Sequence, residues 1–325
     1  QIIEGVLNVG DQLLDIFWAG LIGTSTIAGV GTAQTYKQLV MGGRMGLDTA
    51  MRAQVSRAIG AKNFRLANHL ALQGFTLSAG FSIPIALVGV LLTVPLLQLL
   101  GLGQDVVDAA TNYLRLQFVA AAAFAFRQMG GAALQAAGNA VIPLKATTLT
   151  RVTHIVLSPF LIFGWLGLPE MGIPGAALAD VLAQSLGAAW NFRALFTGQS
   201  YLHLSLREYR FDPPVLLRLT KIALPASVTG MERSIAQLAV VGIVARFGTL
   251  AVAAFSLTRR AENLAHLGAQ GMGGATGVLV GQNLGAGSPD RARKTVYWAV
   301  GYVSLMAVLT ALLMFVFANP LMRVF

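Results

Sequence analysis

Cysteine is absent from this chain of 325 residues, so a disulfide, a thiolate metal site and a cysteine nucleophile are excluded. Charge is also scarce: 11% of the residues are charged, whereas a soluble domain carries roughly 25%. The GxSxG, HExxH and P-loop patterns are missing too. The glycine-rich stretch 268–277 has neither the lysine nor the preceding strand of a phosphate loop, so close helix packing explains it better. We therefore expect no enzyme activity and no cofactor.

Apolar residues fill the chain instead and make up 55% of it. Apolar runs of about 20 residues recur, which is the length that crosses the hydrocarbon core of a bilayer. Glycine and proline separate these runs. We predict an all-α, polytopic membrane protein with spanning helices at roughly 1–20, 24–51, 66–98, 112–138, 143–167, 172–196, 216–245, 249–282 and 292–319.

The net charge of +10 lies in alternate loops between the apolar runs. One set of loops holds fourteen Lys and Arg residues, from Arg52 to Lys294, and the opposite set holds three. Positive residues concentrate on the cytoplasmic side of membrane proteins. The charge therefore predicts a topology, with the first set of loops and the N-terminus in the cytoplasm, and it does not indicate a nucleic-acid surface.

The sequence repeats itself at a fixed offset of 225 residues. Residues 55–67 (VSRAIGAKNFRLA) correspond to 280–292 (VGQNLGAGSPDRA), and 21–31 correspond to 246–256, without a gap. A long repeat in an apolar chain is typical of a transporter built from two similar bundles. Because an even number of predicted helices precedes the second copy, both copies start on the same side and the repeat is parallel.

A polar stretch separates the two copies. We expect residues 1–196 to form a first six-helix lobe, 197–214 a cytoplasmic linker, and 215–325 the first three helices of a second lobe. Residues 101–213 have no partners at the repeat offset. This predicts a fragment of a twelve-helix protein, with the N-terminus clipped and the second lobe truncated.

Seven stretches resemble the multidrug and toxic compound extrusion (MATE) family. In chain order they read LLDIFWAGLIGTSTIAGVG, RAIGAKN, LQAAGNAVIPL, HIVLSPFLIFG, MGIPGAALAD, LTKIALPAS and VLVGQNLGAG. The resemblance implies two six-helix lobes and cation-coupled antiport that exports drugs or toxic organic compounds, driven by protons or sodium. We expect small substrates of cationic or aromatic character, and a monomer in the lipid bilayer of the inner membrane.

Polar side chains line one face of the first predicted helix, because Glu4, Asn8, Asp11 and Asp15 follow each other at spacings of four, three and four. Ionisable groups in hydrocarbon are costly and usually face a bundle interior or a wet cavity. Asp15 matches the helix 1 aspartate that the resembling family uses for cation or proton binding, although a structural pairing is the alternative. Asp11 fits either role equally well. The repeat partner of Asp15 is Val240, so we expect the ion site in the first lobe only.

His154 and Ser158 stand where members of the resembling family often carry Asn and Asp. This departure removes oxygen ligands that sodium prefers, and it favours protons because histidine titrates near neutral pH. The alternative is a core histidine bonded to a neighbouring helix. We predict that Asp15, Asp11, His154 and Ser158 carry ion coupling, with protons favoured over sodium.

Charged side chains also occur on other predicted helices, and we expect them at a central cleft. The candidates are Lys37, Arg44, Asp48, Glu232, Arg233, Arg259, Glu262 and His266. For Arg44 with Asp48, and for Arg259 with Glu262, a local ion pair at helical spacing is the simpler explanation. Asp180 and Arg127 are further charges in apolar helices, with no assigned role.

Two other functions fit these features. A flippase for lipid-linked oligosaccharides or polysaccharides, from the same superfamily, would place cations in its cleft. Four cations keep this open: Lys37, Arg44, Arg127 and Arg259. A non-transporting subunit or remnant would fit the shortened second lobe.

Overall fold

The computed structural model describes Trp18, residues 24–99, 104–167, 169–247, Phe255 and residues 271–316. Within these ranges every regular element is a helix, as predicted. The helices are α2 (Thr24–Gly60), α3 (Phe64–Leu91), α4 (Thr93–Leu99), α5 (Gln104–Ala136), α6 (Val141–Phe163), α7 (Ile173–Phe196), α8 (Pro213–Ala245) and α10 (Pro289–Val316). Residues 271–285 are helical as well. Among the described residues, three helices are long and apolar enough to cross a membrane: Phe64–Leu91, Val141–Phe163 and Pro289–Leu312.

Three predicted helices differ clearly from the observed ones. The helix predicted to begin at residue 112 begins earlier, as α5 at Gln104, because the polar residues of its first turns are not part of the apolar run. The helix predicted to stop at residue 51 continues as α2 to Gly60, because an apolar run marks where a helix leaves hydrocarbon and not where its hydrogen bonds end. The helix predicted over 66–98 is broken at Leu92 into α3 and α4. Pro95 lies in the first turn of α4, and its missing N–H cannot continue the hydrogen bonding of α3.

The backbone reproduces the sequence repeat at the turn that follows α2. The amide of Ala61 donates to Arg57 O at 3.0 Å, and the amide of Ala286 donates to Gln282 O at 2.9 Å, which is the same bond moved by 225 residues. The next residue is left-handed in both copies, with φ of 57° at Lys62 and 69° at Gly287. The two turns therefore share one conformation although few of their side chains agree.

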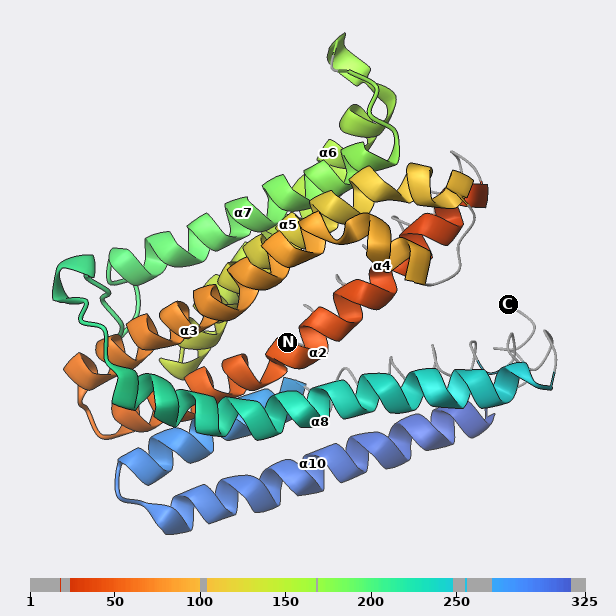
Figure 1. Ribbon diagram of the computed structural model, residues 1–325. Helices are drawn as coiled ribbons and strands as arrows, with labels where there is room; N and C mark the ends of the chain where they lie inside the picture. The colour runs from red at the N-terminus through yellow and green to blue at the C-terminus, as the bar shows by residue number, and fades with distance from the viewer. Residues whose placement is uncertain are drawn as a thin grey trace.

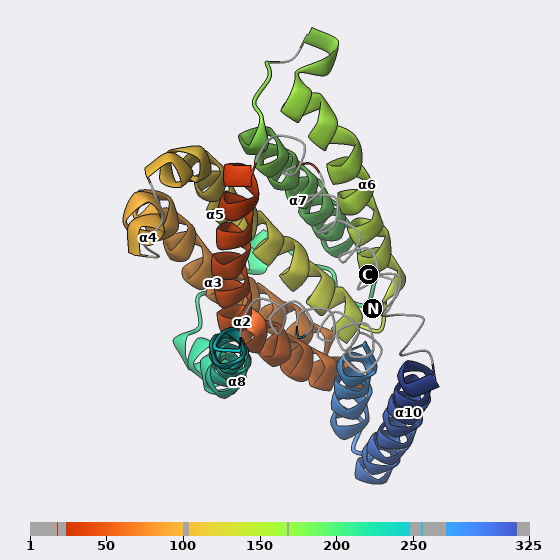
Figure 2. The ribbon, with the colours of Figure 1, turned by 90° about the vertical axis from the view of Figure 1, so that its right-hand side faces the viewer.

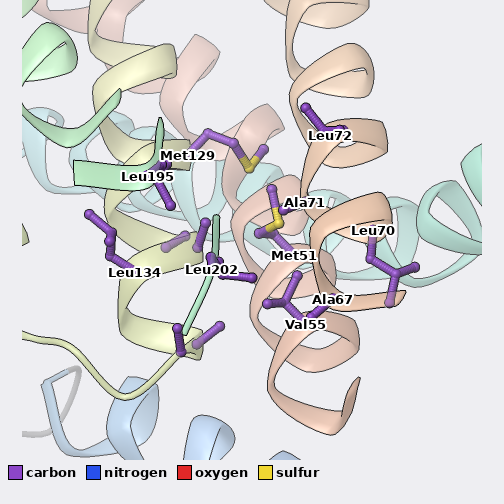
Figure 3. Close-up of a cluster of buried hydrophobic side chains, with 14 of the residues drawn as sticks. Met51, Val55, Ala67, Leu70, Ala71, Leu72, Met129, Leu134, Leu195 and Leu202 are labelled. Carbon is purple, nitrogen blue, oxygen red and sulfur yellow. The ribbon is translucent and has the colours of Figure 1, made fainter. Parts of the chain in front are cut away.

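Helices α2, α3, α5, α6 and α7 form one bundle, in which α5 packs against α2, α3 and α7, and α6 packs against α7 (Figures 1 and 2). Its largest apolar core lies where α2 ends (Figure 3). Met51 and Val55 of α2 meet Met129 of α5 and Leu195 of α7 there. Leu202, from the predicted linker, is fully buried in the same core. The segment between α7 and α8 is thus packed onto this bundle.

Helix α8, the first helix of the second lobe, contacts α2 through small residues. A Cβ placed on Gly46 would lie 1.8 Å from Ala223 O, and one on Gly230 would lie 2.5 Å from Gly42 O. Only glycine allows two helix backbones to approach so closely. The two helices lie together near the Gly60 end of α2 and diverge toward its other end (Figure 1).

A second contact between the lobes is formed by residues that correspond to each other in the two copies of the repeat. A Cβ on Gly60 would lie 2.0 Å from Gln282 O, and a Cβ on Gly285 would lie 2.0 Å from Arg57 O. Gly60 and Gly285 are repeat partners, and so are Arg57 and Gln282. The end of α2 and the end of the helical stretch 271–285 therefore cross around a pseudo-twofold axis.

Candidate functional site

A buried ion pair joins two helices in the interior of the first lobe. Lys37 Nζ of α2 lies 2.9 Å from Asp180 Oδ2 of α7 and donates to Gln117 Oε1 of α5 at 3.2 Å. The Asp180 side chain is 4% exposed and that of Lys37 is 25% exposed. A buried carboxylate needs a partner of opposite charge, and here the partner comes from a helix 143 residues away in sequence.

Hydrogen bonds extend this pair across the lobe. Asp180 Oδ1 accepts from Gln184 Nε2 at 2.9 Å, because residues four apart share one face of α7. Gln184 Oε1 accepts from Arg127 Nε of α5 at 2.7 Å, and Arg127 also donates to Thr147 Oγ1 of α6 at 2.9 Å. Four helices thus contribute to one polar network, which we call the Lys37–Thr147 network: Lys37, Gln117, Asp180, Gln184, Arg127 and Thr147.

Gly187 of α7 allows α6 and the Arg127 side chain to pack close to α7. A Cβ on Gly187 would lie 2.1 Å from Thr150 Oγ1 and 2.7 Å from Arg127 Cδ. Any side chain at this position would push α6 and the Arg127 side chain away from α7. Gly187 therefore permits the approach of α5, α6 and α7 on which the hydrogen bonds of Arg127 depend.

His154 and Ser158 are both buried on α6, next to this network. His154 Nε2 lies 3.4 Å from Ala176 O of α7, and Ser158 Oγ donates to His154 O at 2.6 Å. His154 and Arg151 also act electrostatically on Asp180. The contact between His154 and Ala176 O of α7 fits a core histidine bonded to a neighbouring helix. The electrostatic interaction with Asp180 fits a role in ion coupling.

Arg44 and Asp48 form a buried ion pair at 3.1 Å within α2. This is the local ion pair that their spacing of four residues predicts. Arg44 also donates to Ala125 O of α5 at 3.1 Å. The ring of Phe124 lies between two cations, 5.7 Å from the Arg44 guanidinium and 5.1 Å from that of Arg127. Such cation–π contacts stabilise guanidinium groups away from water.

The other predicted site residues are not brought into this network by the described structure. Glu232 is exposed on α8. Arg233 belongs to the same helix, and its side chain lies outside the described residues. Also outside the described residues are Asp11, Asp15, Arg259, Glu262 and His266.

Sequence reasoning placed Lys37 at a cleft and left Asp180 and Arg127 without partners. It did not predict Gln117, Gln184 or Thr147 as members of a site. One sequence feature could have indicated that these residues form a site. Apolar helices carry charges of both signs, and such charges pair in the interior of membrane proteins.

Comparisons with known proteins agree with this architecture. The MatE family model matches residues 2–160 and 225–325, and the second match begins close to where the second copy of the repeat begins. The chain is 24% identical over 330 residues to the probable multidrug resistance protein YoeA of Bacillus subtilis, covering 100% of this chain and 71% of that protein. It is also 24% identical over 328 residues to a FAD transporter of Shewanella oneidensis, covering 99% of this chain and 71% of that protein.

Solved structures share the fold. One, described as the outward-facing conformation of a multidrug resistance MATE family transporter of the MOP superfamily, superposes with a TM-score of 0.91 at 22% identity and covers 99% of this chain and 71% of its own. A MOP superfamily transporter from Pyrococcus furiosus, described as having a binding pocket of reverse polarity, gives 0.90 at 22% identity, with the same coverage. The family match, which spans most of the sequence, shows that this chain belongs to the MATE family of multidrug efflux transporters, with a two-lobe helical membrane fold and a parallel internal repeat.

Proposed function

We propose that this protein is an antiporter that exports small organic compounds of cationic or aromatic character by alternating access, coupled to protons in preference to sodium. It would act as a monomer in the inner membrane, with its N-terminus in the cytoplasm. Membership of a multidrug efflux family supports the export of small compounds. The observation that carries the proposal further is the Lys37–Thr147 network inside the first lobe.

Charges buried in membrane helices are expensive, so they mark ion pathways and proton relays. The network places Asp180 beside Lys37 and within electrostatic reach of His154. We propose that Asp15, Asp11, His154 and Ser158 take up and release the coupling ion next to this network. His154 supports protons, because its ring exchanges protons near neutral pH and supplies no oxygen ligand for sodium.

The contacts between the lobes support a rocking movement. The glycine contacts between the lobes occupy the half of α2 from Gly42 to Gly60, and α8 diverges from α2 toward the Thr24 end (Figure 1). Rigid lobes that touch at one end can rock about a fixed site, which is how alternating access operates in transporters with repeats.

A flippase for lipid-linked sugars is less well supported. The flippase hypothesis depends on cations in the cleft that are available to bind an anionic substrate. Lys37, however, pairs with Asp180, and Arg44 pairs with Asp48. A paired cation is a weak ligand for a pyrophosphate, because binding would have to break the pair. The relatives named as multidrug resistance proteins also give a flippase no support.

Reconstitution tests the proposal. The full-length protein would be placed in liposomes, and ethidium efflux would be measured under a proton gradient or a sodium gradient. We expect efflux under the proton gradient, and its loss in Asp15→Asn and in Asp180→Asn. Asp290→Asn, which changes an exposed carboxylate at the start of α10, is the matched control and should behave as the wild type. Unchanged coupled efflux in Asp15→Asn would overturn the role assigned to that residue.

A further inference from the structure

The ammonium of Lys37 sits in a setting that a free monovalent cation would also suit. Two oxygens from two different helices surround it, Asp180 Oδ2 at 2.9 Å and Gln117 Oε1 at 3.2 Å. Carboxylate and amide oxygens are the ligands that hard cations prefer. In this protein the cation that these two oxygens bind is the ammonium of Lys37, and not a free ion.

The second oxygen of Asp180 is not open to a cation. Oδ1 accepts from the Gln184 amide, whose own oxygen is held by Arg127. Oδ2 is therefore the oxygen at which a cation and the Lys37 ammonium would compete. Lys37 is the more exposed member of the pair.

Charges from other elements also face Asp180. Arg151 and His154 of α6 act on it electrostatically, and Arg127 of α5 reaches it through Gln184. The Lys37 ammonium adds to this positive charge, lies against Asp180 and repels a further cation there. A tethered group competes at a high effective concentration, because its binding is intramolecular.

We propose that Lys37 is a tethered cation that fills a monovalent-cation site formed by Asp180 and Gln117, and that it thereby excludes sodium from this site. The inference rests on the proposed cation-coupled transport and names the residue that sets its ion selectivity. Removal of the ammonium, with both oxygens kept, turns this position into a site for free sodium or lithium.

Thermal unfolding of the purified full-length protein tests this without measuring transport. The midpoint would be followed as sodium chloride replaces choline chloride at constant ionic strength, because an ion that binds only the folded state raises the midpoint by mass action. Wild type should show no sodium-specific shift. Lys37→Gln should show a saturable rise with sodium, and Lys37→Gln combined with Asp180→Asn should show none. Lys221→Gln, which removes an exposed lysine of α8, is the matched control and should also show none.

The possible results distinguish failure of this inference from failure of the proposed function. A Lys37→Gln protein that folds but gains no sodium-specific shift would overturn the inference. If Lys37→Gln does not fold, Lys37→Ser, which adds a hydroxyl oxygen to the site, takes its place under the same criterion. A sodium shift in the wild type that disappears in Asp180→Asn would also overturn it, because sodium would then reach the carboxylate despite Lys37. Failure of coupled efflux, with these binding results intact, would count against the proposed function alone.

Discussion

The strength of the Lys37–Asp180 pair can be measured as a coupling free energy. Asp180→Leu would leave the Lys37 ammonium with Gln117 as its remaining partner, and Lys37→Met would leave a carboxylate that is 4% exposed without its cation. Breaking a buried pair by removing one partner costs about 3–5 kcal/mol of the free energy of unfolding. Because the Lys37 side chain is 25% exposed, water screens part of the loss, and the low end, about 3 kcal/mol, is expected for each single variant.

The double variant removes both charges and leaves two apolar side chains, a Met of nearly the volume of Lys and a Leu that is larger than Asp. Replacement of a buried pair by well-packed apolar residues is often neutral or stabilising, so the double variant should cost no more than either single one. The cycle then gives a coupling energy of at least about 3 kcal/mol, at the upper end of the range for residues in contact. Unfolding in mixed micelles, driven by a denaturing detergent, provides the assay.

A pair whose two partners are both partly exposed offers a comparison within the same protein. His69 Nε2 lies 3.0 Å from Asp212 Oδ2, with side chains that are 24% and 34% exposed. Because water screens such a pair, its cycle should give a much smaller coupling. Additive effects of Lys37→Met and Asp180→Leu, within about 0.5 kcal/mol, would refute the pairing.

Three further outcomes concern other parts of the fold. Gly60→Leu should lower the free energy of unfolding by about 1–3 kcal/mol through overpacking, whereas Gly80→Leu, whose Cβ meets nothing within 4 Å, should not; equal melting curves would contradict the lobe contact. The pKa of Asp212 is lowered, chiefly by its hydrogen bond with His69, so Asp212 contributes stability above its unfolded pKa and loses it as the pH falls through the lower folded value. The melting temperature of Asp212→Asn should therefore fall less than that of wild type between about pH 5 and pH 2, and parallel curves would count against this linkage. Gly287→Ala should cost about 1 kcal/mol because its φ is positive, and an unchanged melting temperature would speak against that conformation.

The sequence predicted the class of fold because composition and repetition act over hundreds of residues. Apolar runs placed α6, α7, α8 and α10 to within a few residues. The division into 1–196, 197–214 and 215–325 stays a prediction. The end of α2 was missed because hydrogen bonds within a helix continue past the apolar run that hydropathy detects.

The site was only partly predictable from sequence. Spacing within one helix indicated the pair of Arg44 and Asp48, because residues four apart lie on one face. The partner of Lys37 could not be found in this way, since Asp180 lies on another helix and its distance depends on how α2, α5 and α7 pack. Pairing between helices is a property of tertiary structure, and a single sequence shows only that both charges must be satisfied somewhere.

One contact between the lobes bears on how the repeat diverged. A Cβ on Gly281 would lie 1.9 Å from Ser56 Oγ, and residues 56 and 281 are partners at the repeat offset. A position that faces its own copy across a pseudo-twofold axis meets itself in the ancestral duplication, so both copies share one limited space. An increase in the size of either residue then requires a decrease in the other, and serine opposite glycine satisfies that condition. Such axial positions are expected to vary as a pair in this fold, with their combined volume held nearly constant while each residue changes.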